Sequence, residues 1–589
     1  MINKNYLIKK GSIQILLEIW RHLEKRRKIQ LLIFSILNLL SSFSESFSIA
    51  MTLPLISVLI DPNQMWKIQW IQKLFLAFGI NQSSQLITPI TAIFIFASLL
   101  STFIKLFILR TNNFFAASIG NDISCLIYST ILNQPYEKQI EINSSEAISA
   151  ATNYADATRE AIYASLNFLS YSSFVLTIEV TLFIFNWKVA LASILVFGIS
   201  YFLVSYKSKL KILKNGKVIA NFGKERVKSI QEGLGSIRDV LLGSKQKIFI
   251  DKYSKIDLTF RKKAASNKFI TFSPRYIIEN IGFIFLAIIA YSLAGNKNGT
   301  SNILPILGTF AVAAQKLLPS MQQCYNSLGT IRSNKSSVEK VLIILNQKNY
   351  IYNLDGIKPF NFKSEIKLSK ISFKYLNSNK YILNEVDINI KKGERIGIIG
   401  STGSGKSTFT DILMGLLKPI SGQIRIDNVD LYSEKNPLNI FKWRLAISHV
   451  PQNIYLSDCT IAENIAFGIP LKEIDFKKVE NAAFRAKIDY FINGTKNKYL
   501  TKVGENGIKL SGGERQRIGI ARALYHNSQI IVFDEATSAL DDKTESEVIS
   551  SLNQLDEDLT IIIIAHRLTT LDICNRVLKV EDSKINEIL

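Results

Sequence analysis

The sequence predicts a chain of two parts, a polytopic α-helical membrane domain followed by an α/β domain. Hydrophobic residues make up 47% of the 589 residues and the mean hydropathy is +0.16, yet the net charge is +23. Long apolar stretches are confined to the first 340 residues, and short apolar runs separated by glycine-rich motifs follow residue 365. One soluble domain does not combine these features, and the length allows two or more domains.

Six apolar stretches in the first part are each long enough to cross a bilayer, which takes about 20 residues. They lie at about 30–60, 87–109, 161–185, 187–206, 269–294 and 301–326. We therefore expect a polar flank at 1–28, a domain of six transmembrane helices at 29–340, a linker at 341–364 and the α/β domain at 365–589.

The basic residues indicate orientation in a membrane rather than nucleic-acid binding. Arg21, Lys25, Arg26, Arg27 and Lys28 precede the first apolar stretch, as in the cytoplasmic flank of a membrane protein. An even number of spans then leaves both termini and the α/β domain in the cytoplasm. The long polar connections 110–160 and 207–268 suggest helices that continue into the cytoplasm, and we expect no nucleic-acid partner.

Ionisable residues inside the predicted spans need an explanation, because each costs about 2.5–3.5 kcal/mol at mid-helix on insertion scales. Lys105 could extend its ammonium toward a membrane surface, and Arg275 with Glu279 could form a structural pair. Our hypothesis is that Arg275 and Lys316 line a central cavity and meet an anionic substrate.

The outer connection 65–78 has a helical pattern with one broad apolar face. We interpret it as a helix lying in the membrane interface, and the alternative is packing against neighbouring membrane helices.

The α/β part begins with a phosphate-loop pattern, since residues 400–408 read GSTGSGKST between a strand-like run and an amphipathic segment. Glycines let backbone N–H groups approach phosphates, and a helix N-terminus favours negative charge. Lys406 would reach the β- and γ-phosphates, and the Ser407 hydroxyl would ligate Mg²⁺. The alternative is a glycine-rich turn before an ordinary helix. The predicted ATP contacts are Gly400, Ser401, Thr402, Gly403, Ser404, Gly405, Lys406, Ser407 and Thr408.

Five further motifs lie along the same part of the chain, one before this loop and four after it. They are ISFKY (371–375), PQN (451–453), LSGGERQR (510–517), IIVFDEATSALD (530–541) and IIIIAHR (561–567). An apolar strand that ends at Asp534 and Glu535 would place one carboxylate to hold Mg²⁺ and the next to orient or deprotonate water.

In order and spacing these motifs resemble the ATPase domain of ABC transporters. The resemblance implies that Glu535 is the catalytic base, that His566 contacts the γ-phosphate and that Gln452 joins Mg²⁺ to the membrane domain. It also implies that Tyr375 stacks on adenine and that Asp541 crosses a dimer interface. The cofactors would be ATP and Mg²⁺.

Ser511, Gly512 and Gly513 open a second helix N-terminus able to bind an anion. In the family this segment of one copy faces the phosphate loop of another, so we expect a homodimer with two equivalent sites. Glu514 stands where the family more often has Gln.

A membrane domain ahead of the ATPase on one chain resembles the exporters of the family. Gln315-Lys316-Leu317-Leu318-Pro319 resembles a stretch of the exporters that flip lipid-linked oligosaccharides, which commonly have Arg at the position of Lys316. The expected cargo is a lipid-linked oligosaccharide or another glycolipid, moved across a bacterial inner membrane. Segments near 134–137 and 232–244 would transmit ATPase closure to the membrane helices.

Four alternatives remain open at this point. Within transport they are a multidrug pump and a peptide exporter. The others are an ATP-gated channel or regulatory subunit, and a soluble ABC ATPase of the DNA-repair type, which six spans disfavour.

Overall fold

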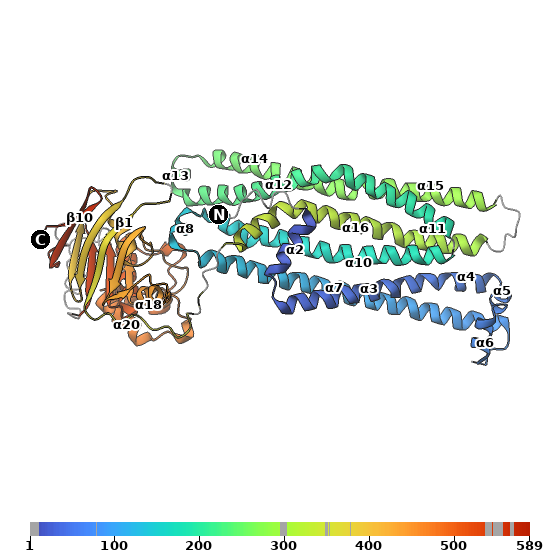
Figure 1. Ribbon diagram of the computed structural model, residues 1–589, viewed down its shortest axis with the longest axis horizontal. Coiled ribbons are helices and arrows are strands. Elements are labelled where there is room, and N and C mark those ends of the chain that lie inside the picture. The colour runs from blue at the N-terminus through green and yellow to red at the C-terminus, as the bar shows by residue number, and fades with distance from the viewer. Residues whose placement is uncertain are drawn as a thin grey trace. The chain divides into compact units, whose positions relative to one another are not determined.

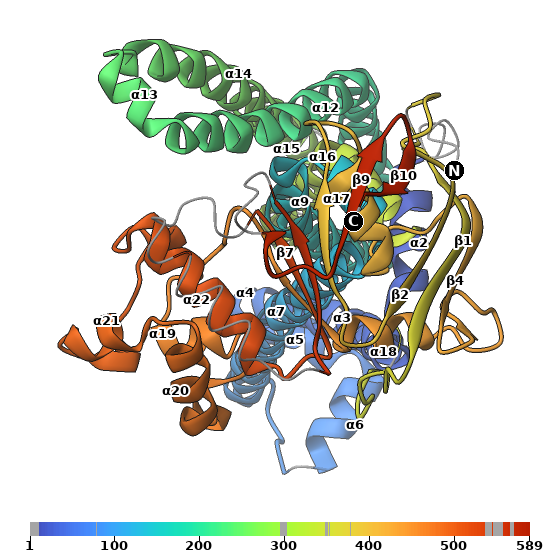
Figure 2. The ribbon, with the colours of Figure 1, turned by 90° about the vertical axis from the view of Figure 1, so that its left-hand side faces the viewer.

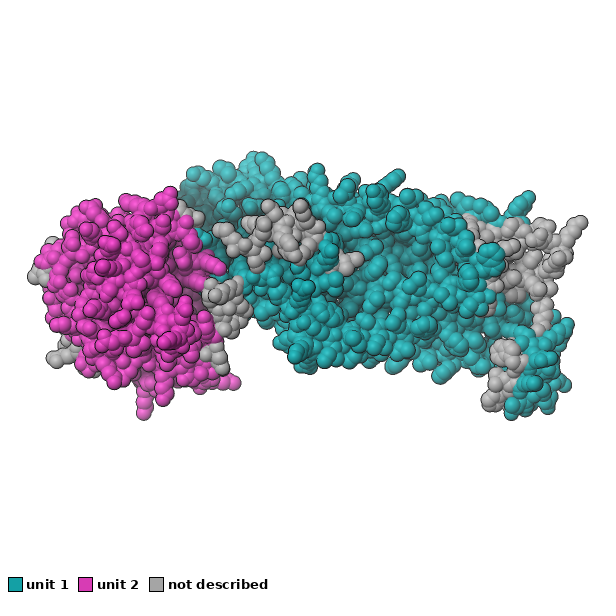
Figure 3. All heavy atoms as spheres, viewed as in Figure 1, with its two compact units in different colours: residues 1–134, 141–351 teal, residues 135–140, 352–589 magenta. Residues whose placement is uncertain are grey.

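The computed structural model describes residues 11–77, 79–185, 187–294, 303–347, 352, 354–376, 378–535, 545, 558–565 and 571–588. The chain forms two compact units (Figure 3). The helical unit comprises residues 1–134 and 141–351, and the sheet unit comprises residues 135–140 and 352–589.

The helical unit consists of long helices that run side by side (Figure 1). Its helices are α2 (Ser12–His22), α3 (Lys25–Ala50), α4 (Thr52–Ile60), α5 (Pro62–Trp66), α6 (Gln69–Ala77), α7 (Ile87–Leu132), α9 (Ser144–Ser149), α10 (Ala155–Phe185), α11 (Trp187–Ser193), α12 (Ile199–Gly235), α13 (Ile237–Leu242), α14 (Gln246–Phe272), α15 (Pro274–Ala294) and α16 (Ile303–Leu345). Short 3-10 or π segments join some of them at Ser83–Leu86, Ala150–Tyr154 and Ile194–Gly198.

The described residues of the six predicted spans are helical apart from turns at Met51 and Ser273, and several helices continue far beyond the spans. Within the described residues, three helical stretches are long and apolar enough to cross a membrane, at Lys25–Ile60, Ser83–Leu132 and Ser144–Ile184. The other three predicted spans do not meet that test there. The helix that contains the second span runs on to Leu132, and the helix that contains the last runs on to Leu345.

Two predicted spans are not continuous helices. The first is divided at Met51 into α3 and α4, because Pro54 has no N–H to donate to the carbonyl of Ala50. The fifth is divided at Ser273, before Pro274, into α14 and α15. In both places the missing proline donor ends one helix and the next begins within a residue.

The described part of the outer segment 65–78 is not one continuous helix. It holds the end of α5 and the whole of α6, separated by turn bonds from the Lys67 N–H to the Asn63 carbonyl and from the Ile68 N–H to the Met65 carbonyl. Met65 and Phe75 are buried against Val58 of α4 and against Leu86 and Ile90. Packing against neighbouring helices thus accounts for these two side chains.

A polar stripe joins α3 to α10 inside the helical unit. Ser46 donates to Thr177 (2.6 Å), Ser42 lies 3.0 Å from the Ser173 hydroxyl, and Ser170 donates to Asn38. Small hydroxyl side chains let helix backbones approach closely and bond across the interface. This contact fixes the face of α3 that points into the bundle.

The sheet unit contains ten strands in two sheets among its described residues, with helices packed beside them (Figure 2). Its strands are β1 (Glu365–Phe373), β2 (Leu383–Lys391), β3 (Arg395–Ile399), β4 (Ser421–Ile426), β5 (Val429–Asp430), β6 (Ile447–Val450), β7 (Ile530–Asp534), β8 (Thr560–Ile564), β9 (Arg576–Glu581) and β10 (Lys584–Glu587). Its helices of five or more residues are α8 (Tyr136–Glu141), α17 (Lys406–Leu413), α18 (Asn439–Leu445), α19 (Ile461–Ile465), α20 (Phe476–Arg485), α21 (Asp489–Gly494) and α22 (Gly512–Tyr525).

The larger sheet has the order β10-β9-β3-β8-β7-β6, and β3, β6, β7, β8 and β9 are parallel. Its central strands are apolar runs buried on both faces, as parallel strands between helices must be. Because these strands are parallel, the segments that follow β3, β6 and β7 leave the sheet at the same edge. Ligands of α/β proteins bind outside this edge.

Candidate functional site

The phosphate loop connects β3 to α17 and has the backbone of a close-packed anion cradle. Gly400, Gly403 and Gly405 have φ of 153°, 82° and 110°. A Cβ at Gly400 would lie 2.5 Å from the Val580 carbonyl oxygen. A side chain at either end of the loop would therefore be both strained and obstructed, so the glycines are required by the fold itself.

Two polar side chains of the loop fit a phosphate ligand. The Lys406 ammonium donates to the carbonyl oxygens of Gly400 (2.8 Å) and Ser401 (3.1 Å), which holds its charge over the loop. The Ser404 hydroxyl oxygen is buried and lacks a hydrogen-bond partner among the described residues. With the free N–H groups at the start of α17, they form a site that suits the phosphates of ATP.

The acidic end of β7 lies beside the end of β6. Asp534 is the last residue of β7, and the next residue, Glu535, has φ of 50°. Gln452, two residues past β6, donates its amide to the Glu535 carboxylate (2.6 Å). The structure thus joins Gln452 to Glu535, two residues that the sequence assigned to one reaction centre from separate motifs.

The charge at this edge favours a cation. Burial raises the pKa of Asp534, the neighbouring charge of Glu535 raises it further, and Lys406 opposes this effect. Burial, together with the charge of Asp534, raises the pKa of Asp411 on α17 to about 6. A divalent cation beside Asp534 would reverse this local balance. Asp534, Ser407 and Gln452 remain the candidate holders of Mg²⁺.

Tyr375 lies close to the phosphate loop, just beyond β1. Its hydroxyl is 3.1 Å from that of Thr408, and its ring meets Phe373 edge-on with centroids 5.2 Å apart. The position agrees with a ring beside a bound nucleotide, and stacking on adenine stays a prediction.

The second anion site opens α22 with a capping box. Ser511 is the N-cap, and its hydroxyl accepts from the Glu514 N–H while the Glu514 carboxylate accepts from the Ser511 N–H (2.8 Å). The glutamate that departs from the family pattern therefore caps its own helix. Because it engages the Ser511 N–H, the N–H groups of Gly512 and Gly513 are the ones left for a ligand.

Two predicted site residues, His566 and Asp541, lie outside the described residues. Strand β8 ends at Ile564, whose carbonyl accepts from the Glu535 N–H (3.1 Å), so the segment that leads to His566 starts at the same edge of the sheet.

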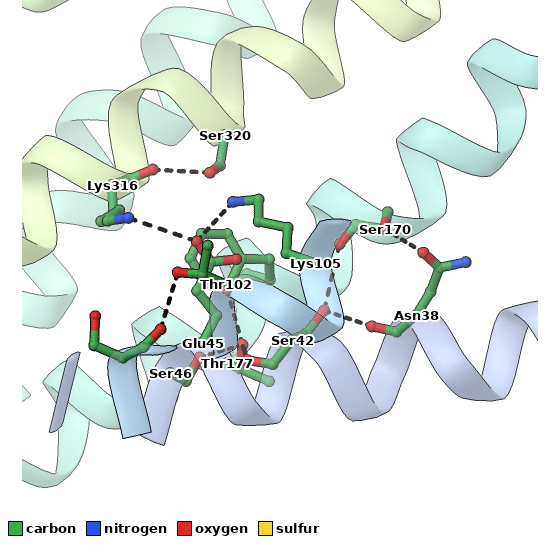
Figure 4. Close-up of polar contacts among 12 residues, drawn as sticks. Asn38, Ser42, Glu45, Ser46, Thr102, Lys105, Ser170, Thr177, Lys316 and Ser320 are labelled. Carbon is green, nitrogen blue, oxygen red and sulfur yellow. Dashed lines mark hydrogen bonds and ion pairs between the residues drawn. The ribbon is translucent and has the colours of Figure 1, made fainter. Parts of the chain in front are cut away.

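A charged cluster lies within the helical unit, where α3, α7 and α16 meet (Figure 4). The Glu45 carboxylate accepts from the Lys105 ammonium at 2.7 Å and pairs with Lys316 at 3.8 Å, through the same oxygen. The Glu45 side chain is 10% exposed, whereas those of Lys105 and Lys316 are 47% and 51% exposed. Glu45 is thus a buried counter-ion shared by two accessible cations.

Arg275 does not belong to this cluster. Within the described helices it pairs with Glu279 on α15 at 3.5 Å, which is the structural pair that the sequence offered as an alternative. Lys105, for which snorkelling was one explanation, instead holds Glu45. Residues 45, 105 and 316 are brought together only by helix packing, and no local sequence signal could have joined them. The cap by Glu514 could have been found, since S-x-x-E before a helix indicates a capping box.

Comparison with known proteins places the chain in a family. A family model described as "ABC transporter" matches residues 383–538. The chain is 34% identical over 300 residues to ABC transporter B family member 29 of Arabidopsis thaliana, across 51% of this chain and 46% of that protein. It is 30% identical over 419 residues to the ATP-dependent lipid A-core flippase of Wigglesworthia glossinidia brevipalpis, across 70% of each chain.

The match to the Arabidopsis protein spans about half of that protein's length. Among solved structures, that of a bacterial Atm1-family ABC exporter with ATP bound superposes with a TM-score of 0.75, at 21% identity, over 96% of this chain and 94% of that one. A helical membrane domain and an ABC ATPase domain on one chain are thus the fold of an exporter. The protein belongs to the ABC transporter family.

Proposed function

We propose that the protein is an ATP-driven exporter that flips an anionic amphiphile, a lipid-linked oligosaccharide or another glycolipid, as a homodimer with two composite ATP sites. The observation that carries this proposal is the joining of the phosphate loop, Asp534, Glu535 and Gln452 at one sheet edge of a chain that also holds membrane-length helices. Similarity to lipid A-core flippases supports a glycolipid cargo.

The chain's own residues account for ATP binding and hydrolysis. The loop N–H groups and Lys406 would hold the phosphates, while Ser407 and Asp534 would hold Mg²⁺, which would supply stabilisation of charge on the phosphoryl group. Glu535 accepts the proton of the attacking water, and its bond from Gln452 (2.6 Å) aims the carboxylate. His566 would contact the γ-phosphate.

The second copy completes each site. Ser511, Gly512 and Gly513 of the partner would face the phosphate loop, and Asp541 would cross the interface. ATP binding would favour the closed pair of ATPase domains, and closure would shift the population of conformations of the membrane helices. Hydrolysis would let the pair reopen. Residues 135–140, which belong to the sheet unit although they follow α7, support the role of the segment near 134–137 in transmitting closure.

The charged cluster supports an anionic head group as cargo. Two ammonium groups share one buried carboxylate, so the cluster has a formal excess of one positive charge with both cations half exposed. The Glu45–Lys316 pair is the longer of the two, so a phosphate would displace Glu45 from Lys316 more readily than from Lys105. Lys316 offers a point charge where an arginine would offer a fork. Arg275 remains the second proposed cavity residue.

Six spans with both termini and the ATPase domain in the cytoplasm of a bacterial inner membrane are part of this proposal. The basic flank at Lys25–Lys28 supports that orientation.

Replacement of Glu535 by Gln tests the ATPase assignment. Without a proton acceptor, ATP hydrolysis should fall by about 100-fold or more, while ATP binding is retained. Phosphate release and retention of labelled ATP by the purified protein measure the two effects. Appreciable turnover by Glu535→Gln would contradict the assigned role.

Removal of the cavity cations tests the cargo. The double variant Arg275→Ala/Lys316→Ala in proteoliposomes should lose about 10-fold or more of its transport of lipid-linked sugar, because a charge-assisted bond contributes about 1.5–3 kcal/mol. Basal ATPase activity should stay near that of the wild type. Lys262→Ala on α14 removes an exposed lysine and serves as control. Unchanged transport by the double variant would reject an anion-binding role for these residues.

A further inference from the structure

A groove of about 490 Å³ runs between α12 and the broken helix α14–α15, apart from the Glu45 cluster. Its lining is mostly apolar, with lysines on one wall. The lining residues are Ser200, Leu203, Val204, Lys207, Ser208, Lys211, Ile270, Ser273, Pro274, Ile277, Ile278 and Ile281.

Hydrogen bonds through α16 hold the two walls of the groove in place. The buried Tyr325 hydroxyl donates to the carbonyl of Ile270 (3.1 Å) and lies 2.9 Å from the Ser208 hydroxyl. The Gln322 amide donates to the Thr271 carbonyl (2.8 Å). These contacts satisfy polar groups around the break before Pro274, so the groove is a built feature of the fold.

Charge is distributed unevenly along the groove. Lys207 and Lys211 lie one helical turn apart and are exposed, and no carboxylate lies among the lining residues. They directly follow the predicted span 187–206, whereas Leu203, Ile277 and Ile281 lie within predicted spans. In the proposed topology, on which this inference rests, the apolar walls lie at the depth of acyl chains and the two ammonium groups lie at the depth of head groups on the cytoplasmic side.

We propose that this groove binds an anionic phospholipid of the cytoplasmic leaflet. One acyl chain lies along the isoleucine and leucine walls, and the phosphate lies between Lys207 and Lys211. An anionic head group complements these two cations, and lysines near a membrane surface attract anionic lipid. The site goes beyond the proposed transport cycle, because it shares no residue with the Glu45 cluster or the ATP site.

Photocrosslinking in proteoliposomes tests this site. The full-length protein is reconstituted in phosphatidylcholine vesicles that contain a trace of phosphatidylglycerol or phosphatidylcholine with a diazirine on the acyl chain. Peptides containing Leu203 or Ile277 should be labelled about 10-fold more by the phosphatidylglycerol probe. Lys207→Gln/Lys211→Gln should lower that labelling to the phosphatidylcholine level.

Matched variants make the result specific. Lys209→Gln/Lys214→Gln removes the same charge from α12 outside the groove and should leave labelling unchanged, and Ile277→Trp should fill the groove and abolish labelling with both lysines present. Equal labelling by the two probes, or an equal loss in the control variant, would overturn the proposal. So would a disulfide between two copies of Leu203→Cys, because a second chain would then cover the groove. ATP hydrolysis is measured for the wild type and for each variant. Normal hydrolysis together with absent or non-specific lipid labelling would overturn the lipid site and leave the proposed transporter function standing.

Discussion

The carboxyl groups of Asp411 and Asp534 lie near the phosphate loop and interact electrostatically. Asp411 lies on α17, and burial together with the charge of Asp534 raises its pKa to about 6. An unfolded aspartate has a pKa of about 3.9. The group therefore contributes stability that is fully present below pH 4, and this contribution is lost as pH rises through about 6.

Asp411→Asn should consequently stabilise the nucleotide-free protein at pH 8. After allowance for solvent screening of a partly exposed group, the gain should be about 1 kcal/mol at pH 8 and should vanish near pH 4. Thermal unfolding of wild type and variant in Mg²⁺-free detergent between pH 4 and pH 8 measures the difference. Asp458→Asn removes an exposed carboxylate elsewhere in the sheet unit and serves as the control variant. A difference that grows toward low pH would have the wrong sign.

Elements show how far local rules reach. Helices α3 and α14 end shortly before a proline, because proline lacks the N–H that would continue the helix. Apolar runs form the buried parallel strands. The turn between α12 and α14 carries α13, where Leu241 and Leu242 are 56% and 87% exposed. Exposed apolar side chains at the tip of a long helical pair indicate a docking surface, which agrees with the proposed transmission of closure through 232–244.

Leu242→Asp should uncouple hydrolysis from transport. An aspartate cannot be buried in an apolar contact without a large desolvation cost, so transport in proteoliposomes should fall by about 10-fold while basal ATPase activity changes little. Leu258→Asp places the same charge on α14, where Leu258 is 51% exposed, and should keep coupling intact. Equal transport by wild type and Leu242→Asp would remove α13 from the coupling path.

On the scale of the whole molecule, the proposed ATP sites each need two copies of the chain. The phosphate loop and the Ser511 cap belong to the same sheet unit. In the family arrangement, however, a γ-phosphate bound at the phosphate loop of one copy meets the Ser511 segment of the other copy. A single chain would then lack half of each site.

Mixed dimers test this arrangement. In a Glu535→Gln background, Lys406→Ala and Ser511→Ala homodimers should each fail to retain labelled ATP. Coexpression should restore about a quarter of the retention, because half of randomly formed dimers have one intact site of two. A mixture no better than its parents, or a strictly monomeric protein with full hydrolysis, would contradict composite sites.

The sequence by itself determined the two-part architecture, the phosphate loop and the acidic end of β7. These features depend on local patterns: apolar length, strand alternation and glycines at fixed spacing. It could not determine that the outer segment divides between α5 and α6, because a periodic apolar face does not show where the backbone turns. Nor could it predict the ion pairs of Glu45 with Lys105 and Lys316, or the direct hydrogen bond from Gln452 to Glu535. Those contacts link residues far apart in the chain, and only helix packing and strand order bring such side chains within hydrogen-bonding distance.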